Sequence, residues 1–295
     1  MRTDCSMLEY PYDNITHYVA VTLGDRCVPD TFVIPTVFIY GLILVLGVLG
    51  NLGTCVVIIK NKNMQTPTNC YLFSLAISDL LMLILGLPGE LYGMFVPQYP
   101  YEFGETTCKL RAFLIEFTSY ASILTITCFS IERWLAICFP LRIHLFSTVK
   151  RASKVIICVW ICAFLTALPV VFLVLVNKVP LPDWAKGLPG ISNDGETIIN
   201  TEYCGLDSTR SIEQKRLFYT SFTFFFLLPA LLISFVYCHI VIKLRSANDY
   251  LSSQNAQTKS AAKSRKGILR ILVAVVITFF LCWFPFHVQR LMTHY

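Results

Sequence analysis

Six long apolar segments constrain this chain more than any other feature. They cover residues 32–59, 70–96, 108–139, 155–176, 217–244 and 268–291. Each exceeds the roughly 20 residues that a helix needs to cross a bilayer. Only 14% of the residues are charged, against about 25% in soluble globular domains. The sequence therefore predicts an all-α membrane protein, with an N-terminal segment at 1–31 and a bundle of spanning helices at 32–295.

The charged residues are sorted between the two sides of the predicted bundle. Lysine and arginine gather in or beside alternate loops, and acidic residues crowd the opposite loops and residues 1–31. By the positive-inside rule the basic loops are cytoplasmic, which makes the N-terminus extracellular. The same distribution argues against a nucleic-acid partner, although the net charge is +6.

The N-terminal segment lacks the basic start and apolar run of a cleavable signal peptide. We therefore expect the first span to act as its own signal. Asn14-Ile15-Thr16 fits the N-glycosylation acceptor pattern, which agrees with an extracellular N-terminus.

Most of the 12 cysteines lie inside apolar segments, where cysteine behaves as a small hydrophobic residue. Four are placed towards the outer side: Cys5, Cys27 and Cys204 lie outside these segments, and Cys108 begins the third one. Cys108 and Cys204 are the favoured disulfide, which would tie the start of the third span to the loop after the fourth. For Cys5 and Cys27 the sequence leaves two alternatives open, a second disulfide or two free thiols.

The third span sets the scale of the bundle. Cys108 and Arg133 are 25 residues apart, which is roughly 37 Å on a helix and about the thickness of a bilayer. Cys108 is thus expected at the outer surface and the Glu132-Arg133 pair at the inner surface.

Polar residues near the middle of the spans form a first candidate site. An ionisable group inside a span is costly unless it is paired or hydrated, so each is a candidate functional residue. Asp79, with Asn51 and Ser122, could hold a small cation such as sodium. A polar cluster that only fixes helix packing explains the same residues equally well.

Three charged residues near the outer ends of spans form a second candidate site. Glu90, Glu116 and Arg290 would offer two carboxylates to a basic ligand group and one guanidinium to a carbonyl or carboxylate. Phe286, one turn before Arg290, joins the candidate ligand-binding set. Two alternatives remain open: Arg290 could neutralise Glu116 internally, and Glu90 and Arg290 could extend to the membrane interface.

Two loops have distinctive compositions. Residues 177–216 are rich in proline, glycine and acidic residues, as a lid over an outer cavity would be, whereas residues 246–263 are typical of a mobile loop.

No metalloprotease, serine-hydrolase or phosphate-loop motif occurs, so an enzyme is not expected. Scattered histidines such as His239 and His287 are interpreted as packed or interfacial residues rather than as ligands.

An ordered set of motifs resembles the rhodopsin-like (class A) G protein-coupled receptors. It consists of Gly50-Asn51, Leu75-Ala-Ile-Ser-Asp79, Cys108, Glu132-Arg133-Trp134, Trp160, Pro229 with Tyr237, and Cys282-Trp283-Phe284-Pro285. The stretches 132–141 and 283–292 are most similar to the neuromedin U and pyrokinin peptide receptors. The resemblance implies a rhodopsin-like bundle with six of the usual seven helices, since no seventh span with an Asn-Pro-x-x-Tyr motif occurs in the 295 residues. We therefore expect a receptor truncated after its sixth helix.

The resemblance also implies a ligand and partners. The ligand would be a C-terminally amidated neuropeptide with an arginine near its end, bound by Glu90 and Glu116, with Arg290 at the terminal amide. Other partners would be a heterotrimeric G protein, the lipid bilayer of the plasma membrane and, in a dimer, a second receptor.

Roles for the remaining motif residues follow from the same resemblance. Asp79, Asn51 and Ser122 would hold an allosteric sodium ion. Arg133 would be held by Glu132 and then move to Tyr237 on activation. The packing switch would consist of Ile123, Pro229, Phe279 and Trp283.

Other function classes fit less well. A non-signalling form that pairs with full-length receptors is the first alternative. A channel or transporter is disfavoured, because the charges near the midplane form no ring and the sequence has no internal repeat.

Overall fold

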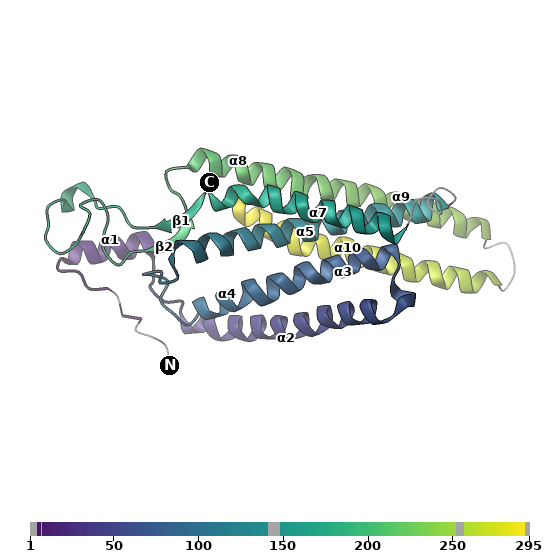
Figure 1. Cartoon of the computed structure of the whole chain (residues 1–295), viewed down its shortest axis with the longest axis horizontal. Helices are drawn as coiled ribbons and strands as arrows, with labels where there is room; N and C mark the ends of the chain where they lie inside the picture. The colour runs from purple at the N-terminus through teal and green to yellow at the C-terminus, as the bar shows by residue number, and fades with distance from the viewer. Residues whose placement is uncertain (1–4, 7, 141–147, 252–256, 293–295) are drawn as a thin grey trace. The chain divides into compact units, whose positions relative to one another are not determined.

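The computed structural model describes residues 5–6, 8–140, 148–251 and 257–292, and most of them are helical (Figure 1). Six helical segments in this described part are long and apolar enough to cross a membrane: Asp30–Lys60, Pro67–Gly93, Gly104–Cys138, Val149–Val171, Ser211–Leu244 and Val273–Met292. The prediction of an all-α membrane protein is confirmed.

Four of these segments are simple helices. They are α2 (Asp30–Lys60), α5 (Gly104–Cys138), α7 (Val149–Val171) and the outer part of α10 (Gln257–Met292). Large apolar side chains are exposed along α2, including Leu46 and Leu49 at 60% and 63% exposure. Lipid tails are as apolar as these side chains, so the exposure carries no cost in a bilayer.

The other two segments each contain a π-helical turn just before a proline. In the second span, α3 (Pro67–Leu81) and α4 (Leu87–Gly93) flank the π-turn η2 (Met82–Gly86). In the fifth, α8 (Ser211–Phe222) and α9 (Leu228–Leu251) flank η4 (Thr223–Leu227). Pro88 and Pro229 lack an N–H and would clash with the preceding turn, and a π-turn widens the helix at that point.

The chain divides into two compact units, which are described separately. The first unit comprises Met1–Gly53, Asp79–Thr118 and Thr166–Gln214, and the second comprises Thr54–Ser78, Ser119–Leu165 and Lys215–Tyr295.

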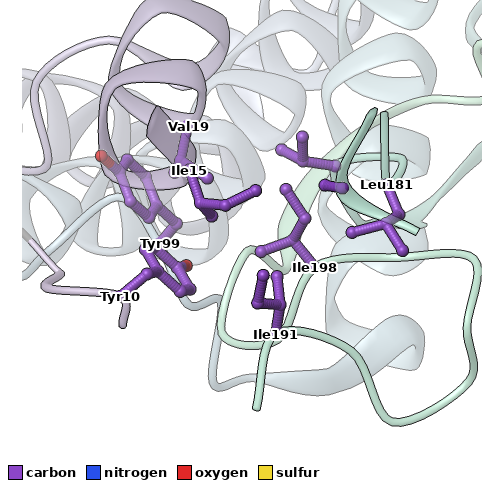
Figure 2. Close-up of a cluster of buried hydrophobic side chains, with 9 residues drawn as sticks. Tyr10, Ile15, Val19, Tyr99, Leu181, Ile191 and Ile198 are labelled. Carbon is purple, nitrogen blue, oxygen red and sulfur yellow. The ribbon is translucent and has the colours of Figure 1, made fainter. Parts of the chain in front are cut away.

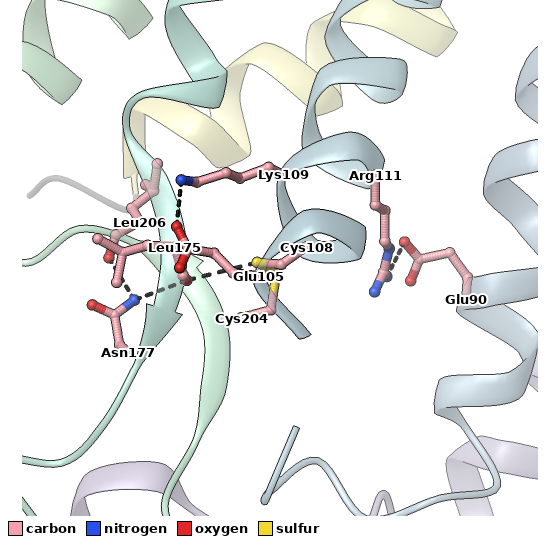
Figure 3. The surroundings of a disulfide bond; sticks show 9 residues. All are labelled: Glu90, Glu105, Cys108, Lys109, Arg111, Leu175, Asn177, Cys204 and Leu206. Atoms are coloured by element: carbon pink, nitrogen blue, oxygen red, sulfur yellow. Dashed lines mark hydrogen bonds and ion pairs between the residues drawn. A yellow bond between two sulfur atoms is a disulfide. The ribbon is translucent and has the colours of Figure 1, made fainter. Parts of the chain in front are cut away.

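A disulfide-anchored hairpin organises the loop after α7 in the first unit. Strand β1 (Val174–Asn177) pairs antiparallel with β2 (Tyr203–Leu206), with Val176 opposite Cys204. Cys204 forms a disulfide with Cys108 at the start of α5, as predicted (Figure 3). The sequence placed residues 174–176 in the fourth span, but α7 ends at Val171 and pairing with β2 draws these residues into a strand.

The N-terminal segment is folded, which the sequence did not predict. Helix α1 (Asp13–Leu23) lies between Cys5 and Cys27, and these two cysteines form a second disulfide. The open alternative is thereby settled in favour of a bond.

Helix α1 shares a hydrophobic core with the loop that follows β1. Ile15 and Val19, both almost completely buried, pack with Ile191 and Ile198 of that loop (Figure 2). The phenol of Tyr10 donates a hydrogen bond to the Ile199 carbonyl at 2.9 Å. The loop predicted as a lid is therefore a small folded layer with its own core.

The loop predicted at residues 246–263 is largely helical. Helix α9 continues to Leu251 and α10 begins at Gln257, and residues 252–256 lie outside the described part. Alanine, lysine and arginine favour helix, and extending an existing helix avoids the cost of nucleation. The prediction of a mobile loop is therefore wrong for the described residues.

Candidate functional site

Glu90 in the first unit forms an ion pair with Arg111. Glu90 lies in α4 just after Pro88, and Arg111 lies in α5 three residues after Cys108. Their Oε1 and Nη2 atoms are in direct contact, and the two side chains are 38% and 36% exposed (Figure 3). Arg111 was not among the residues predicted from the sequence. Its nearness to Cys108, and hence to the outer end of the third span, was the available signal.

Glu116 is the most buried acid of the first unit's candidate residues. It lies five residues after Arg111 on α5 and is only 2% exposed. Next to it in sequence, Phe113 and Phe117 stack with ring centroids 5.6 Å apart. A buried carboxylate is a strong acceptor for hydrogen bonds from a charged donor.

Arg290 in the second unit is held by aromatic rings. Its guanidinium carbon lies 4.2 Å from the ring centroid of Phe286 and 5.6 Å from that of Phe218. Cation–π contacts of this kind fix the plane and direction of a guanidinium. Phe286 is thus placed to orient Arg290. Neighbouring His287 is 2% exposed and packs 5.5 Å from Phe226, so it is a packed residue as predicted.

The predicted ligand-binding residues are thus divided between the units. Glu90 and Glu116 belong to the first, and Phe286 and Arg290 to the second.

The predicted sodium-binding residues are also divided. Asp79 and Asn51 belong to the first unit, where the Asn51 amide donates to the Gly47 carbonyl at 3.0 Å and keeps its own oxygen as an acceptor. Ser122, in the second unit, shares a hydrogen bond of 2.8 Å with the Ser78 hydroxyl. Carboxylate, amide and hydroxyl oxygens are the ligand types that hard cations accept. The residue types fit sodium, and the site stays a prediction.

A polar cluster joins three helices of the second unit. The indole of Trp160 in α7 donates to the Ser74 hydroxyl of α3 at 2.9 Å, and Ser74 also contacts Thr125 of α5 at 3.3 Å. Hydrogen bonds between small polar side chains stabilise helix packing inside membranes. Trp160, which carried part of the resemblance, therefore has a structural contact.

An aromatic cluster in the second unit contains two of the predicted switch residues, Phe279 and Trp283. Ile123 and Phe279 are completely buried, and Phe279 stacks on Phe226 with centroids 6.1 Å apart. Trp283 contacts Phe286, with centroids 5.8 Å apart. Phe226, three residues before Pro229, also contacts Phe280, Phe284 and His287. Phe226 was not predicted from the sequence. The run Phe224-Phe225-Phe226, shortly before Pro229, was the available signal.

Arg133 contacts another helix of the second unit. Its guanidinium donates to the hydroxyl of Thr68 in α3 and lies 5.8 Å from the ring centroid of Phe129. The phenol of Tyr237 in α9 shares a hydrogen bond of 2.9 Å with Ser130, three residues before Arg133. The predicted exchange of Arg133 between Glu132 and Tyr237 stays a prediction, and Thr68 is a contact that the sequence analysis missed.

Comparison with known proteins gives consistent results. Residues 50–295 match the family described as 7 transmembrane receptor (rhodopsin family). The chain is 51% identical over 291 residues to the neuromedin U receptor homolog nmur-2 of Caenorhabditis elegans, covering 98% of this chain and 72% of that protein. It is 34% identical over 286 residues to neuromedin-U receptor 2 of Mus musculus, covering 97% and 68%. It is 35% identical over 323 residues to the pyrokinin-1 receptor of Drosophila melanogaster, covering 92% and 70%.

Proposed function

Since this chain belongs to the rhodopsin family of seven-transmembrane receptors, and within it to the neuromedin U and pyrokinin receptors, we propose that its ligand is a C-terminally amidated peptide with an arginine near its end. Binding of this peptide activates a heterotrimeric G protein. We propose both the chemical class of the ligand and the residues that bind the ligand.

The buried carboxylate of Glu116 is the observation that supports the ligand chemistry. Glu116 is 2% exposed on α5, and hydrogen bonds to a charged group are stronger where water is excluded. A guanidinium suits this carboxylate, because it is always charged and can donate two parallel hydrogen bonds to it. We therefore assign the ligand arginine to Glu116, with Glu90 as a second acid.

Arg290 is assigned to the terminal amide region of the peptide. A guanidinium donates readily to carbonyl oxygens, and the ring of Phe286 at 4.2 Å holds it in one orientation. A fixed donor loses less conformational entropy on binding than a mobile one. Phe286 thus contributes by orienting Arg290.

The signal is assigned to the aromatic cluster and to Arg133. Ile123, Pro229, Phe279 and Trp283 form the switch, with Phe226 packed against Phe279. Arg133 then leaves its internal partners and contacts the G protein. Because agonist and G protein both bind the active state better, each raises the affinity for the other.

An allosteric sodium ion is assigned to Asp79, Asn51 and Ser122. The ion would stabilise the inactive state by binding it more tightly than the active state. A ligand with equal affinity for both states would not shift their populations.

The protein is a multi-pass membrane protein, and we place it in the plasma membrane with its N-terminus outside. The disulfides Cys5–Cys27 and Cys108–Cys204 need an oxidising compartment. Asn14 is exposed on α1, as a glycan acceptor must be. Glycosidase treatment should shift the gel band of the wild type but not that of Asn14→Gln, and this result would support the orientation. The same band pattern for both proteins would contradict glycosylation at this position.

The test is calcium release in cells that express this chain, exposed to a panel of amidated, arginine-bearing peptides. Surface level is measured in parallel with an N-terminal tag. A saturable response, lost in Arg133→Ala at equal surface level, is the expected result. Silence at good surface expression would contradict signalling by this chain.

A further inference from the structure

We propose that Arg111 is an internal competitor for Glu90, which the ligand's arginine must displace, and that the released Arg111 transfers to Glu102. This inference rests on the proposed function, because it concerns how the same acidic site selects its ligand. It assigns a specificity role to two residues outside the predicted ligand-binding set.

The internal pair and the proposed ligand contact use the same chemical groups. The Glu90–Arg111 contact is a guanidinium–carboxylate pair, the interaction that the ligand arginine would make with Glu90. Both side chains are more than a third exposed, so water reaches the pair and it can exchange without breaking a dry core. Pairs with this exposure are weak and easily replaced by an equivalent partner.

A cavity beside Arg111 gives its side chain space after displacement. Arg111 lines a cavity of 490 Å³ in the first unit, together with Tyr101 and Glu102. The positive charge of Arg111 reaches Tyr101, where it partly offsets the rise in the phenol's pKa caused by burial. Arg111 thus pairs with Glu90 and also lines this cavity.

Glu102 provides the new partner. It is exposed at the wall of the same cavity, nine residues before Arg111. A cation released from Glu90 would otherwise remain beside the arriving ligand arginine, where like charges repel. Transfer to Glu102 restores a pair and removes this repulsion.

The arrangement lowers apparent affinity and sharpens specificity together. The observed affinity of a ligand falls by the fraction of molecules in which its site is open. A peptide with a cation at this position can replace Arg111 on Glu90, whereas an uncharged analogue leaves the internal pair in place. Arg111 thus selects for charge in the ligand.

The test is saturation binding to the full chain in membranes, with a fluorescent amidated peptide carrying one arginine near its end. We expect Arg111→Gln to raise affinity about two- to fivefold, the range of a half-exposed ion pair. Lys109→Gln is the matched control, because Lys109 lies on the same helix with the same charge but pairs with Glu105. It should leave affinity unchanged.

Two further comparisons isolate the mechanism. Replacing the ligand's arginine by citrulline keeps its shape without the charge, and the gain from Arg111→Gln should then disappear. Glu102→Gln should weaken the arginine peptide in the wild-type background and have no effect when Arg111→Gln is also present.

Equal affinity of Arg111→Gln and Lys109→Gln for the arginine peptide would overturn the inference while the proposed function stands. An equal gain for the citrulline peptide would also overturn it, since competition between cations would not be the cause. If no variant, nor the wild-type chain, binds the arginine peptide, the proposed ligand is wrong and the inference falls with it.

Discussion

The indole N–H of Trp134 in α5 donates a hydrogen bond of 2.9 Å to Nδ1 of His239 in α9. Nδ1 accepts this bond through the lone pair of the ring nitrogen. The thiol of Cys138 lies 3.4 Å from the same nitrogen. One histidine nitrogen therefore links two helices of the second unit near the Glu132-Arg133 pair.

Replacing the indole donor should weaken this link. Trp134→Phe keeps an aromatic ring beside Phe139 and removes the N–H, so we expect a loss of about 1 kcal/mol of stability. Thermal unfolding of the purified protein in detergent measures it. Trp184→Phe is the control, because Trp184 is exposed and contacts Tyr18 edge-on. Equal unfolding temperatures for both variants would show that the hydrogen bond contributes nothing.

The folded N-terminal layer predicts a contrast between two residues of α1. Ile15 is completely buried, whereas Val21 is 71% exposed. Ile15→Ala removes buried methyl groups and should cost about 2–5 kcal/mol within this layer, while Val21→Ala should cost almost nothing. Protease sensitivity of an N-terminal tag on intact cells reports the difference. Both variants leave the Asn14-x-Thr16 pattern intact. Matched cleavage rates would contradict a shared core between α1 and the loop.

Tyr10 predicts an alkaline limit for the same layer. Burial raises the pKa of Tyr10 from 10.0 to about 12. Because the folded form binds this proton more tightly, its contribution is complete below pH 10 and is lost as the pH rises towards 12. Protease sensitivity of the N-terminal tag on purified protein should therefore increase over that range in the wild type. Tyr10→Phe should be more sensitive at neutral pH, since it lacks the bond to Ile199, and should change less between pH 10 and 12. Parallel curves would exclude Tyr10 as the cause.

The features that depend on composition and on local motifs were predictable from the sequence. The spanning helices follow from apolar length, and Cys108–Cys204 follows from where these two cysteines lie relative to the spans. The positions of Asp79 and Arg133 within their helices follow from the constant rise of a helix.

The features that depend on pairing between distant segments were not predictable. Ile15 meets Ile198 across more than 180 residues of sequence, and neither segment alone signals the other. Arg111 was missed for a similar reason, because only the structure shows that it reaches Glu90. Phe226 lies in a run of phenylalanines whose burial depends on how α10 packs against η4.

The Arg133–Thr68 contact predicts a change in basal signalling. While its guanidinium donates to Thr68, Arg133 is occupied by the receptor's own side chain. Thr68→Val keeps the shape and removes the acceptor, so we expect basal G protein activation to rise severalfold at equal surface level. Thr66→Val is the control, since Thr66 caps Asn69 without contacting Arg133. Unchanged basal activity would show that Thr68 does not restrain Arg133.

The proposed recognition of the ligand depends on Glu116, a buried acid assigned to the arginine of an amidated peptide. The most direct measurement is the affinity of the wild type and of Glu116→Gln for an arginine peptide and its citrulline analogue, with Glu105→Gln as the control on the same helix. We expect Glu116→Gln to weaken binding of the arginine peptide by about 1.5–3 kcal/mol and to leave binding of the citrulline peptide nearly unchanged. Glu105→Gln should affect neither. Equal losses for both peptides, or unchanged affinity for the arginine peptide, would contradict the claim.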